Sequence, residues 1–358
     1  MAPAPSVSVQ ASPETPVDAP NRASVKALSE SSSLSFVPTN YSYTESAASE
    51  VDKDSIPVID FSLLTSSDPD QRSRAIQDLD KAAQEWGFFL LVNHGVPESL
   101  FKAVISGCEE FFNMMLEEKQ AFSGRNIWDP IRFGTGVDVK VEKFFFWRDF
   151  LKLFVHPEFH CPSKPEALRE AVREYSIKTR AIVLELLKCL SEAMGLGPSY
   201  IEKTMNMDSS FQVFASNLYP PCPQPELAMG IPAHTDHGLL TMLIENAIAG
   251  LEIQHNGGWY NVYPLPNSFV VNIADQLEVL SNGRYKSIWH RAAVNSKVTR
   301  MSIACPHGPS LDTVVAPAQE LLDGESQPAL YKPMKYKDYM EMLSEGKPCL
   351  ERVRLPVA

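Results

Sequence analysis

Hydrophobic residues in the first half of the chain recur at helical spacing and predict three main helices. Asp68 is expected to cap the first helix, with Pro69 at its first helical position. Apolar side chains then repeat at helical spacing over 75–86, and again over 101–112. A longer amphipathic run over 165–194 predicts the third helix, and glycines follow its end. Each of these helices would bury one face.

The second half of the chain changes to short apolar runs typical of β-strands. Turn residues such as Asn256-Gly257-Gly258 and Ser281-Asn282-Gly283 separate several of these runs. Closely spaced short strands predict a sandwich or barrel, such as a jelly roll. Helices first and a compact β-core second favour one α+β unit over two separable domains. The predicted strands cover residues 55–61, 88–92, 211–218, 239–244, 251–255, 259–262, 269–273, 288–294 and 301–305.

The same pattern divides the chain into four segments. Residues 1–50 are rich in Ser, Pro and Ala and are predicted to form a disordered tail. An N-terminal region over 55–160 is expected to pack on a β-core that covers 208–309. A helical extension is expected over 310–358. Within the N-terminal region, residues 126–143 have poor periodicity, which predicts a loop or an irregular hairpin.

Charge and cysteine content exclude several classes of partner. The formal net charge of −12 argues against nucleic acid and against an anionic membrane, because little here would neutralise phosphates. No apolar run approaches the length of a membrane span. The six cysteines are scattered without a Cys-x-x-Cys pair, which favours reduced thiols in a cytoplasmic protein over disulfides or a zinc site. We expect a monomer whose partners are small molecules.

Two histidines and one aspartate form a candidate metal site. If the segment around His234 is a strand, His234 and Asp236 point to the same face because they are two positions apart. His290, in a later β-type run, is the candidate third ligand. Two imidazoles and one carboxylate on one side of a metal leave the opposite positions open, as in non-haem Fe(II) oxygenases. Zinc can use the same ligands, so these residues alone do not fix the metal.

An arginine and a serine on one later strand form a candidate carboxylate site. Arg300 comes ten positions after His290, and Ser302 should point to the same face. A guanidinium and a hydroxyl can hold a carboxylate together. A buried arginine with no evident acidic neighbour needs an anionic partner, and a dicarboxylate cosubstrate would supply one. Asn217 and Tyr219, just before the candidate metal strand, add further polar groups.

Together these motifs resemble the plant soluble 2-oxoglutarate/Fe(II)-dependent dioxygenases, the class that includes the flavonoid oxygenases. The resemblance rests on His-x-Asp, the distal His290, the Arg-x-Ser motif and the Asn217–Leu227 segment Asn-Leu-Tyr-Pro-Pro-Cys-Pro-Gln-Pro-Glu-Leu. It begins at Ile56-Pro57-Val58-Ile59-Asp60 and covers nearly all of the chain beyond the tail. Several independent motifs in the same order make chance agreement a poor explanation.

The resemblance implies a fold and an activity. The fold would be a distorted double-stranded β-helix, or jelly roll, flanked by N-terminal and C-terminal helices. The activity would be oxidation of a small, largely apolar plant specialised metabolite (a phenolic, flavonoid, terpenoid or alkaloid) with 2-oxoglutarate and O2, giving succinate and CO2. Hydroxylation, demethylation and desaturation all belong to the class, and ascorbate is the expected reductant. The implied sites are Fe(II) on His234, Asp236 and His290, and 2-oxoglutarate on Arg300 and Ser302 with Tyr219 and Asn217.

The residues that would contact the substrate are harder to predict. The aromatic run 143–150 and the preceding irregular stretch lie where the family contacts its substrates, so Phe133 and Phe150 are candidates. Anthocyanidin-forming relatives have an aromatic and an acidic residue after the Arg-x-Ser strand. This chain has Pro306-His307-Gly308 there, which argues against a flavonoid bound in that manner.

Two other functions share the expected fold. One is an iron oxidase that resembles the ethylene-forming oxidases and takes no 2-oxoglutarate. The other is a small-molecule-binding protein without turnover, against which the complete His-Asp-His set argues.

Overall fold

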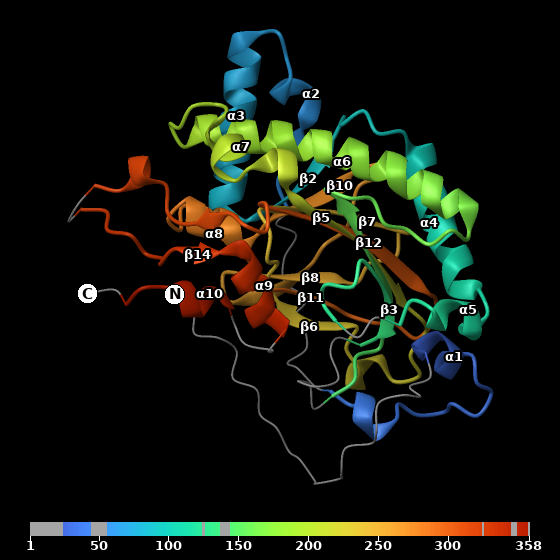
Figure 1. The fold of residues 1–358 in the computed structure, drawn as a ribbon. Helices are drawn as coiled ribbons and strands as arrows, with labels where there is room; N and C mark the ends of the chain where they lie inside the picture. The colour runs from blue at the N-terminus through green and yellow to red at the C-terminus, as the bar shows by residue number, and fades with distance from the viewer. Residues whose placement is uncertain are drawn as a thin grey trace.

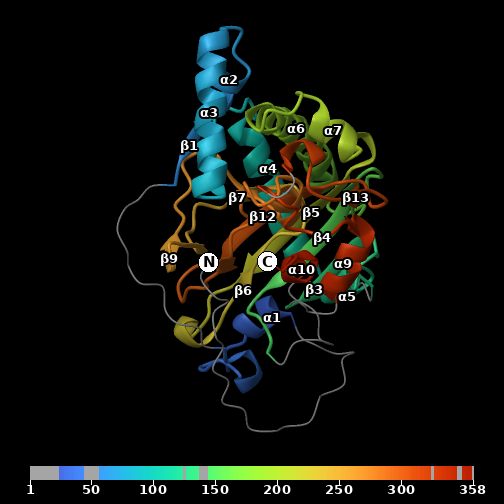
Figure 2. The same cartoon turned by 90° about the vertical axis from the view of Figure 1, so that its left-hand side faces the viewer.

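The fold is built on two facing β-sheets with helices packed on the outside of the larger sheet (Figures 1 and 2). A computed structural model describes residues 24–43, 56–123, 126–136, 144–323, 326–344 and 349–356. The larger sheet has eight strands in the order β1-β2-β10-β7-β12-β5-β4-β3. These are β1 (Val58–Asp60), β2 (Phe88–Val92), β10 (Phe269–Ile273), β7 (Leu240–Glu245), β12 (Arg300–Gly308), β5 (Phe211–Tyr219), β4 (Asp149–His156) and β3 (Ile131–Thr135).

The second sheet has four strands in the order β6-β11-β8-β9, and each pair of adjacent strands is antiparallel. In the larger sheet only the β1–β2 pair is parallel. These facing sheets confirm the predicted jelly-roll core, in which side chains of alternate strand positions fill the space between the sheets. The strands are β6 (Ile231–His234), β11 (His290–Ala292), β8 (Leu251–His255) and β9 (Gly258–Asn261).

Three helices cover the outer face of the larger sheet (Figure 1). They are α3 (Pro69–Glu85), α4 (Glu98–Asn113) and α6 (Glu166–Ala193). The Asp68 side chain caps α3 as predicted and accepts hydrogen bonds from the backbone N–H groups of Asp70 and Gln71. Buried residues of these helices join the outward-facing residues of the sheet in one hydrophobic core. This packing makes the sheet a rigid wall behind the pocket.

The remaining elements connect and flank this core. No helix in the described ranges has the length and apolar character needed to cross a membrane. All six cysteines are free and buried. The shorter elements are α2 (Phe61–Leu64), α5 (Leu116–Gln120), α7 (Tyr200–Thr204), η2 (Met207–Ser209), η3 (Pro225–Leu227), α8 (Asp275–Leu280), β13 (Val314–Val315), η4 (Gln319–Leu321), β14 (Met334–Lys335), α9 (Tyr336–Ser344) and α10 (Cys349–Val353).

The β3–β4 hairpin differs from the sequence expectation. β3 lies inside the stretch expected to be a loop or irregular hairpin, and β4 was not predicted as a strand at all. Leu151 and Leu153 of β4 face the helices, where they join the main core. The alternate positions, including Phe150 and Lys152, face the inner side of the sheet. Burial alternates along β4 from Leu151 onward. Phe150 and Phe154, however, place apolar side chains on the inner face as well, so the two faces do not separate into an apolar and a polar one in the sequence.

An N-terminal segment also departs from expectation. The prediction of a disordered tail is wrong for residues 24–43, which contain α1 (Val25–Ser29) and η1 (Thr39–Tyr41). The buried Asp149 carboxylate accepts hydrogen bonds from the N–H groups of Val25 and Lys26, at 2.8 and 3.0 Å. Tyr41 packs edge-on against Trp147, with 5.4 Å between ring centroids. The other positions of that predicted tail, 1–23 and 44–50, lie outside the described residues.

Candidate active site

His234, Asp236 and His290 converge at one end of the smaller sheet. His234 ends β6 and His290 begins β11, and the two residues are direct partners in the antiparallel pair. The Asp236 Oδ1 atom lies 3.8 Å from His234 Nε2 and 3.7 Å from His290 Nε2. One potential ligand atom from each residue lies within 4.8 Å of the others. Asp236 itself lies just beyond β6, so the turn after the strand, not strand alternation, brings it to the histidines.

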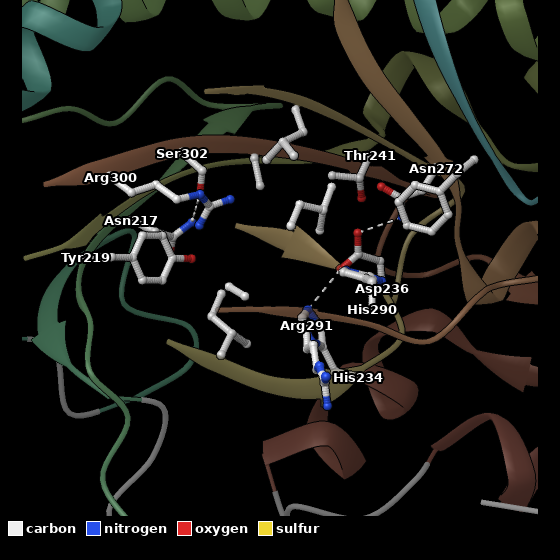
Figure 3. A pocket seen from close by; sticks show the side chains of 16 residues that line it. Asn217, Tyr219, His234, Asp236, Thr241, Asn272, His290, Arg291, Arg300 and Ser302 are labelled. Atoms are coloured by element: carbon white, nitrogen blue, oxygen red, sulfur yellow. Dashed lines mark hydrogen bonds and ion pairs between the residues drawn. The ribbon is translucent and has the colours of Figure 1, made fainter. Parts of the chain in front are cut away.

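Hydrogen bonds hold both imidazoles with Nε2 toward the centre of this triad. His234 Nδ1 donates to the Pro232 carbonyl at 2.9 Å, and His290 Nδ1 donates to the Ile288 carbonyl at 3.1 Å. With Nδ1 protonated, Nε2 keeps its lone pair for a metal. Asp236 Oδ2 accepts a hydrogen bond from Asn272 Nδ2 at 2.9 Å, which orients the carboxylate (Figure 3). These are the outer contacts that orient metal ligands in proteins.

Protonation states in the triad also suit a metal. Burial acts to raise the pKa of Asp236, but the two imidazoles and hydrogen bonds from Thr241 and Asn272 hold that pKa well below its usual range. Burial, with His290 nearby, lowers the pKa of His234. At neutral pH the aspartate is therefore ionised and His234 is neutral, which are the forms that bind divalent metal ions.

A second polar group lies on the opposite side of the same pocket, on β5 and β12 (Figure 3). In their antiparallel pair, Arg300 is opposite Tyr219 and Ser302 is opposite Asn217. The Arg300 guanidinium lies over the Tyr219 ring, 4.7 Å from its centroid. Asn217 Nδ2 donates to Ser302 Oγ at 3.4 Å. A Cβ atom at Gly250 would lie 2.8 Å from the Arg300 side chain, so this glycine makes room for the arginine.

The expectation that Arg300 has no acidic neighbour is wrong. Arg300 Nη2 donates to Oε1 of Glu245, whose side chain is buried on β7. The sequence did not reveal this pair because its members are 55 positions apart and meet only through the pairing of β7 with β12. Burial raises the pKa of Glu245 although Arg300 opposes this. Arg300 Nε and Nη1 remain buried without a hydrogen-bond partner among the described residues, so the guanidinium keeps donors for a further anion.

The two substrate candidates point to opposite faces of the sheet. Phe133 faces the helices and packs against Phe111 and Phe112, so its prediction as a substrate contact is wrong. Phe150 faces inward, and its ring lies so close to Gly134 that a Cβ atom there would come within 2.8 Å of it. The two residues face opposite sides because successive side chains of a strand alternate between its faces. Phe133 is paired with Leu151, the neighbour of Phe150.

Other histidines have structural partners. His237 has its Nδ1 atom 2.7 Å from the Tyr336 hydroxyl. His94 Nε2 lies 3.0 Å from the Asn267 carbonyl. Among the residues that the structure describes, the His234–Asp236–His290 cluster is the one candidate metal site of its kind.

Comparison with known proteins identifies the family. Residues 210–309 match the 2OG-Fe(II) oxygenase superfamily, and residues 56–174 match the family described as "non-haem dioxygenase in morphine synthesis N-terminal". The 2-oxoglutarate-dependent dioxygenase 19 of Oryza sativa subsp. japonica is 47% identical, over 80% of this chain and 85% of that protein. Flavanone 3-dioxygenase 2 of the same organism is 36% identical, over 84% of this chain and 87% of that protein.

A solved structure agrees over nearly the whole chain. The crystal structure of JOX2 in complex with 2OG, Fe and JA superimposes with a TM-score of 0.84 at 31% identity, covering 94% of this chain and 98% of that one. The resemblance in motifs, the jelly-roll fold and these matches agree. The chain belongs to the plant 2-oxoglutarate/Fe(II)-dependent dioxygenases, and it is an oxidoreductase that oxidises a small metabolite with 2-oxoglutarate and O2.

Proposed function

We propose that His234, Asp236 and His290 bind Fe(II), and that Arg300 binds the distal carboxylate of 2-oxoglutarate. The observation that carries this proposal is one pocket that joins the triad to the buried Arg300 guanidinium, whose Nε and Nη1 have no hydrogen-bond partner among the described residues. A dicarboxylate fits both ends, because one end can bind a metal and the other an arginine. Ser302 and Tyr219 stand beside Arg300 and would complete the carboxylate site, with Asn217 orienting the Ser302 hydroxyl.

Each residue has a defined task in the reaction. Bound iron and 2-oxoglutarate supply the oxidising chemistry, in which O2, 2-oxoglutarate and a substrate C–H group give succinate, CO2 and a hydroxylated product. The Pro232 and Ile288 carbonyls accept hydrogen bonds from Nδ1 of the two histidines, which turns each Nε2 toward the metal position. Arg300 fixes the orientation of the cosubstrate by charge-assisted hydrogen bonds. Apolar lining residues such as Phe88 and Leu243 limit the access of water.

We propose a plant specialised metabolite as the substrate, with hydroxylation, demethylation or desaturation as the outcome. Similar proteins support this range, because they include flavanone 3-dioxygenase 2 and thebaine 6-O-demethylase. For the remaining properties we propose ascorbate as reductant, a monomer, and a cytoplasmic location. The six free, buried cysteines support a reducing compartment.

Anaerobic reconstitution tests the two binding assignments separately. Fe(II) and 2-oxoglutarate together should give the weak visible charge-transfer band of the chelate. Asp236→Ala and His290→Ala should abolish iron binding and the band, whereas Arg300→Ala should retain iron and lose the band at moderate 2-oxoglutarate concentration. His237→Ala is the matched control, because His237 adjoins the triad but bonds to Tyr336, and it should retain iron. Iron binding that survives in Asp236→Ala and His290→Ala would exclude the proposed metal site.

A further inference from the structure

The inner face of the larger sheet carries one row of residues that runs from the pocket to β3, at the edge of the sheet. Strand pairing places Leu243, Ala304, Ala215, Lys152 and Arg132 side by side across β7, β12, β5, β4 and β3. Leu243 and Ala304 line the pocket that contains the triad. Ala215 and Ala304 have methyl side chains, so the side chains in the middle of the row are short. The two cations, Lys152 and Arg132, lie at the β4 and β3 end of the row.

The Lys152 side chain lies on the inner face of β4, beside the Phe150 ring. Its Nζ lies 5.3 Å from the centroid of the Phe150 ring, on the inner face, while the adjacent Leu151 and Leu153 are buried on the other face. Arg148 lies over the same Phe150 ring, at 5.3 Å. Arg148 also donates hydrogen bonds to Asn217 Oδ1 and to the Gly136 carbonyl, and Arg132 is the strand partner of Lys152 on β3.

Within the ranges that the structure describes, no hydrogen bond or ion pair joins the Lys152 ammonium group to an acidic side chain. Asp149, the acidic residue of β4, points to the opposite face, where it accepts hydrogen bonds from Val25 and Lys26. Burial, with Arg132 and Arg148 nearby, lowers the pKa of Lys152 to about 7, while the charge of Asp236 acts in the opposite direction. A partly buried ammonium among other cations destabilises the substrate-free fold, and an anionic ligand would reverse that cost.

Arg300 is not expected to bind the anionic ligand of Lys152. It lies opposite Tyr219, two positions along β12 from Ser302, on the side of the pocket where the cosubstrate carboxylate is expected. Strands lie about 4.8 Å apart, so Lys152 is about 10 Å from Ala304, two strands away.

We propose that the substrate is a small organic carboxylate that extends from the pocket past Ala304, and that the Lys152 ammonium on the inner face of β4 binds its carboxylate group. The proposal rests on the proposed function of the pocket and refines it, because the expected metabolite then has an anionic end as well as an apolar body. Phe150 provides an apolar surface beside that anionic end, and Arg132 adds a second positive charge.

Benzoate and its uncharged isostere benzamide test the proposal on the full-length protein, loaded with Fe(II) and saturating 2-oxoglutarate without O2. Calorimetric titration should show benzoate binding at least about 10-fold more tightly than benzamide, as expected for one charge-assisted hydrogen bond. Lys152→Met should remove this preference and Lys152→Arg should keep it. Lys119→Met is the matched control, because Lys119 is also buried over a phenylalanine ring, that of Phe133, but on the other face of the sheet. It should keep the preference.

Comparison of benzoate and benzamide binding by the wild-type protein tests the carboxylate assignment even if a variant folds poorly. Melting temperatures identify such a variant. Benzoate that binds no better than benzamide, or not at all, overturns the carboxylate assignment. A preference that survives in a folded Lys152→Met protein overturns the role of Lys152. The charge-transfer band is recorded on the same samples. Loss of the band signals failure of the proposed cosubstrate site, whereas an intact band with no benzoate preference signals failure of this inference alone.

Discussion

Glu245 gives the sharpest prediction, because it already accepts a hydrogen bond from the Arg300 guanidinium, which is proposed to bind 2-oxoglutarate. The Glu245 side chain is buried, and its Oε1 accepts a hydrogen bond from Arg300 Nη2. Its Oε2 has no hydrogen-bond partner among the described residues. Any carboxylate that binds the free side of Arg300 therefore approaches a second carboxylate. Glu245→Gln keeps the size of the side chain and one acceptor, and it removes the negative charge.

The size of the effect follows from Coulomb repulsion. Two unit charges about 6 Å apart repel by about 3 kcal/mol at an effective dielectric constant of 20, which corresponds to about 100-fold in affinity. Wild-type protein can avoid this repulsion when Glu245 takes up a proton, and burial already raises the pKa of Glu245. The protonated form dominates at low pH. We therefore expect Glu245→Gln to bind 2-oxoglutarate about 10- to 100-fold more tightly at pH 8, and the two proteins to converge as the pH falls.

The assay is an anaerobic titration of the Fe(II) protein with 2-oxoglutarate at several pH values, followed by the charge-transfer band. Without cosubstrate the variant should melt at a lower temperature, because removing one partner of a buried ion pair typically costs about 3–5 kcal/mol and glutamine recovers only part of this. Bound 2-oxoglutarate should recover the difference. Glu252→Gln is the matched control, because Glu252 forms another buried pair, with Arg291 at 2.6 Å. It should lose stability without tighter cosubstrate binding.

Equal or weaker 2-oxoglutarate binding by Glu245→Gln at pH 8 would refute this reasoning. Such a result would mean that Glu245 remains neutral throughout, or that it positions Arg300 for the cosubstrate instead of competing with it. A gain in 2-oxoglutarate affinity that does not depend on pH would support repulsion between Glu245 and the cosubstrate, but it would exclude proton uptake by Glu245.

Three further predictions concern neighbouring features. Gly250→Ala should displace the Arg300 side chain, since the added Cβ would lie 2.8 Å from it, and should raise the 2-oxoglutarate concentration needed for the charge-transfer band without loss of iron. Asp149→Ala should release the segment 24–43 and cost about 2–3 kcal/mol, as loss of hydrogen bonds to a buried charge predicts; unchanged proteolysis of that segment would contradict the anchoring role. The pKa of Lys152 is about 7, so between about pH 7 and 10 the unfolded chain binds more protons than the folded one, and wild-type stability should rise with pH relative to Lys152→Met. Denaturant titrations of both proteins at pH 7 and 9 measure this, and a constant difference would contradict it.

The parts of the candidate site that could be predicted from the sequence are those whose residues stand close together in short motifs. His234 lies two positions from Asp236, and Arg300 two positions from Ser302, so each pair is visible without knowledge of the fold. His290 was assigned through the family resemblance and its place in a β-type run. The jelly roll was predictable for a similar reason, because its strands are short, apolar and separated by turn residues.

The missed residues depend on strand pairing, which a single sequence does not specify. Glu245 meets Arg300 only because β7 pairs with β12 in one register. Lys152 was not singled out because β4 was not predicted as a strand, so the face on which its side chain lies was unknown. Phe133 was assigned to the pocket for the same reason, although it lies one position from the inward-facing Arg132. A shift of one residue would have exchanged the faces of all these side chains.

The pairing pattern also explains how one sheet can serve several ligands at once. Adjacent rows on its inner face have different chemistry: Asn217, Ser302 and Glu245 lie in one row, and the row with Lys152 lies beside it. The β12 and β5 strands cross both rows, so their packing against the helices fixes the proposed cosubstrate and substrate sites relative to each other. Substrate preference can then change through β3 and β4, at the edge of the sheet, while Arg300 and the triad stay in place. A change at Lys152 should therefore alter which substrate binds long before it alters the binding of 2-oxoglutarate.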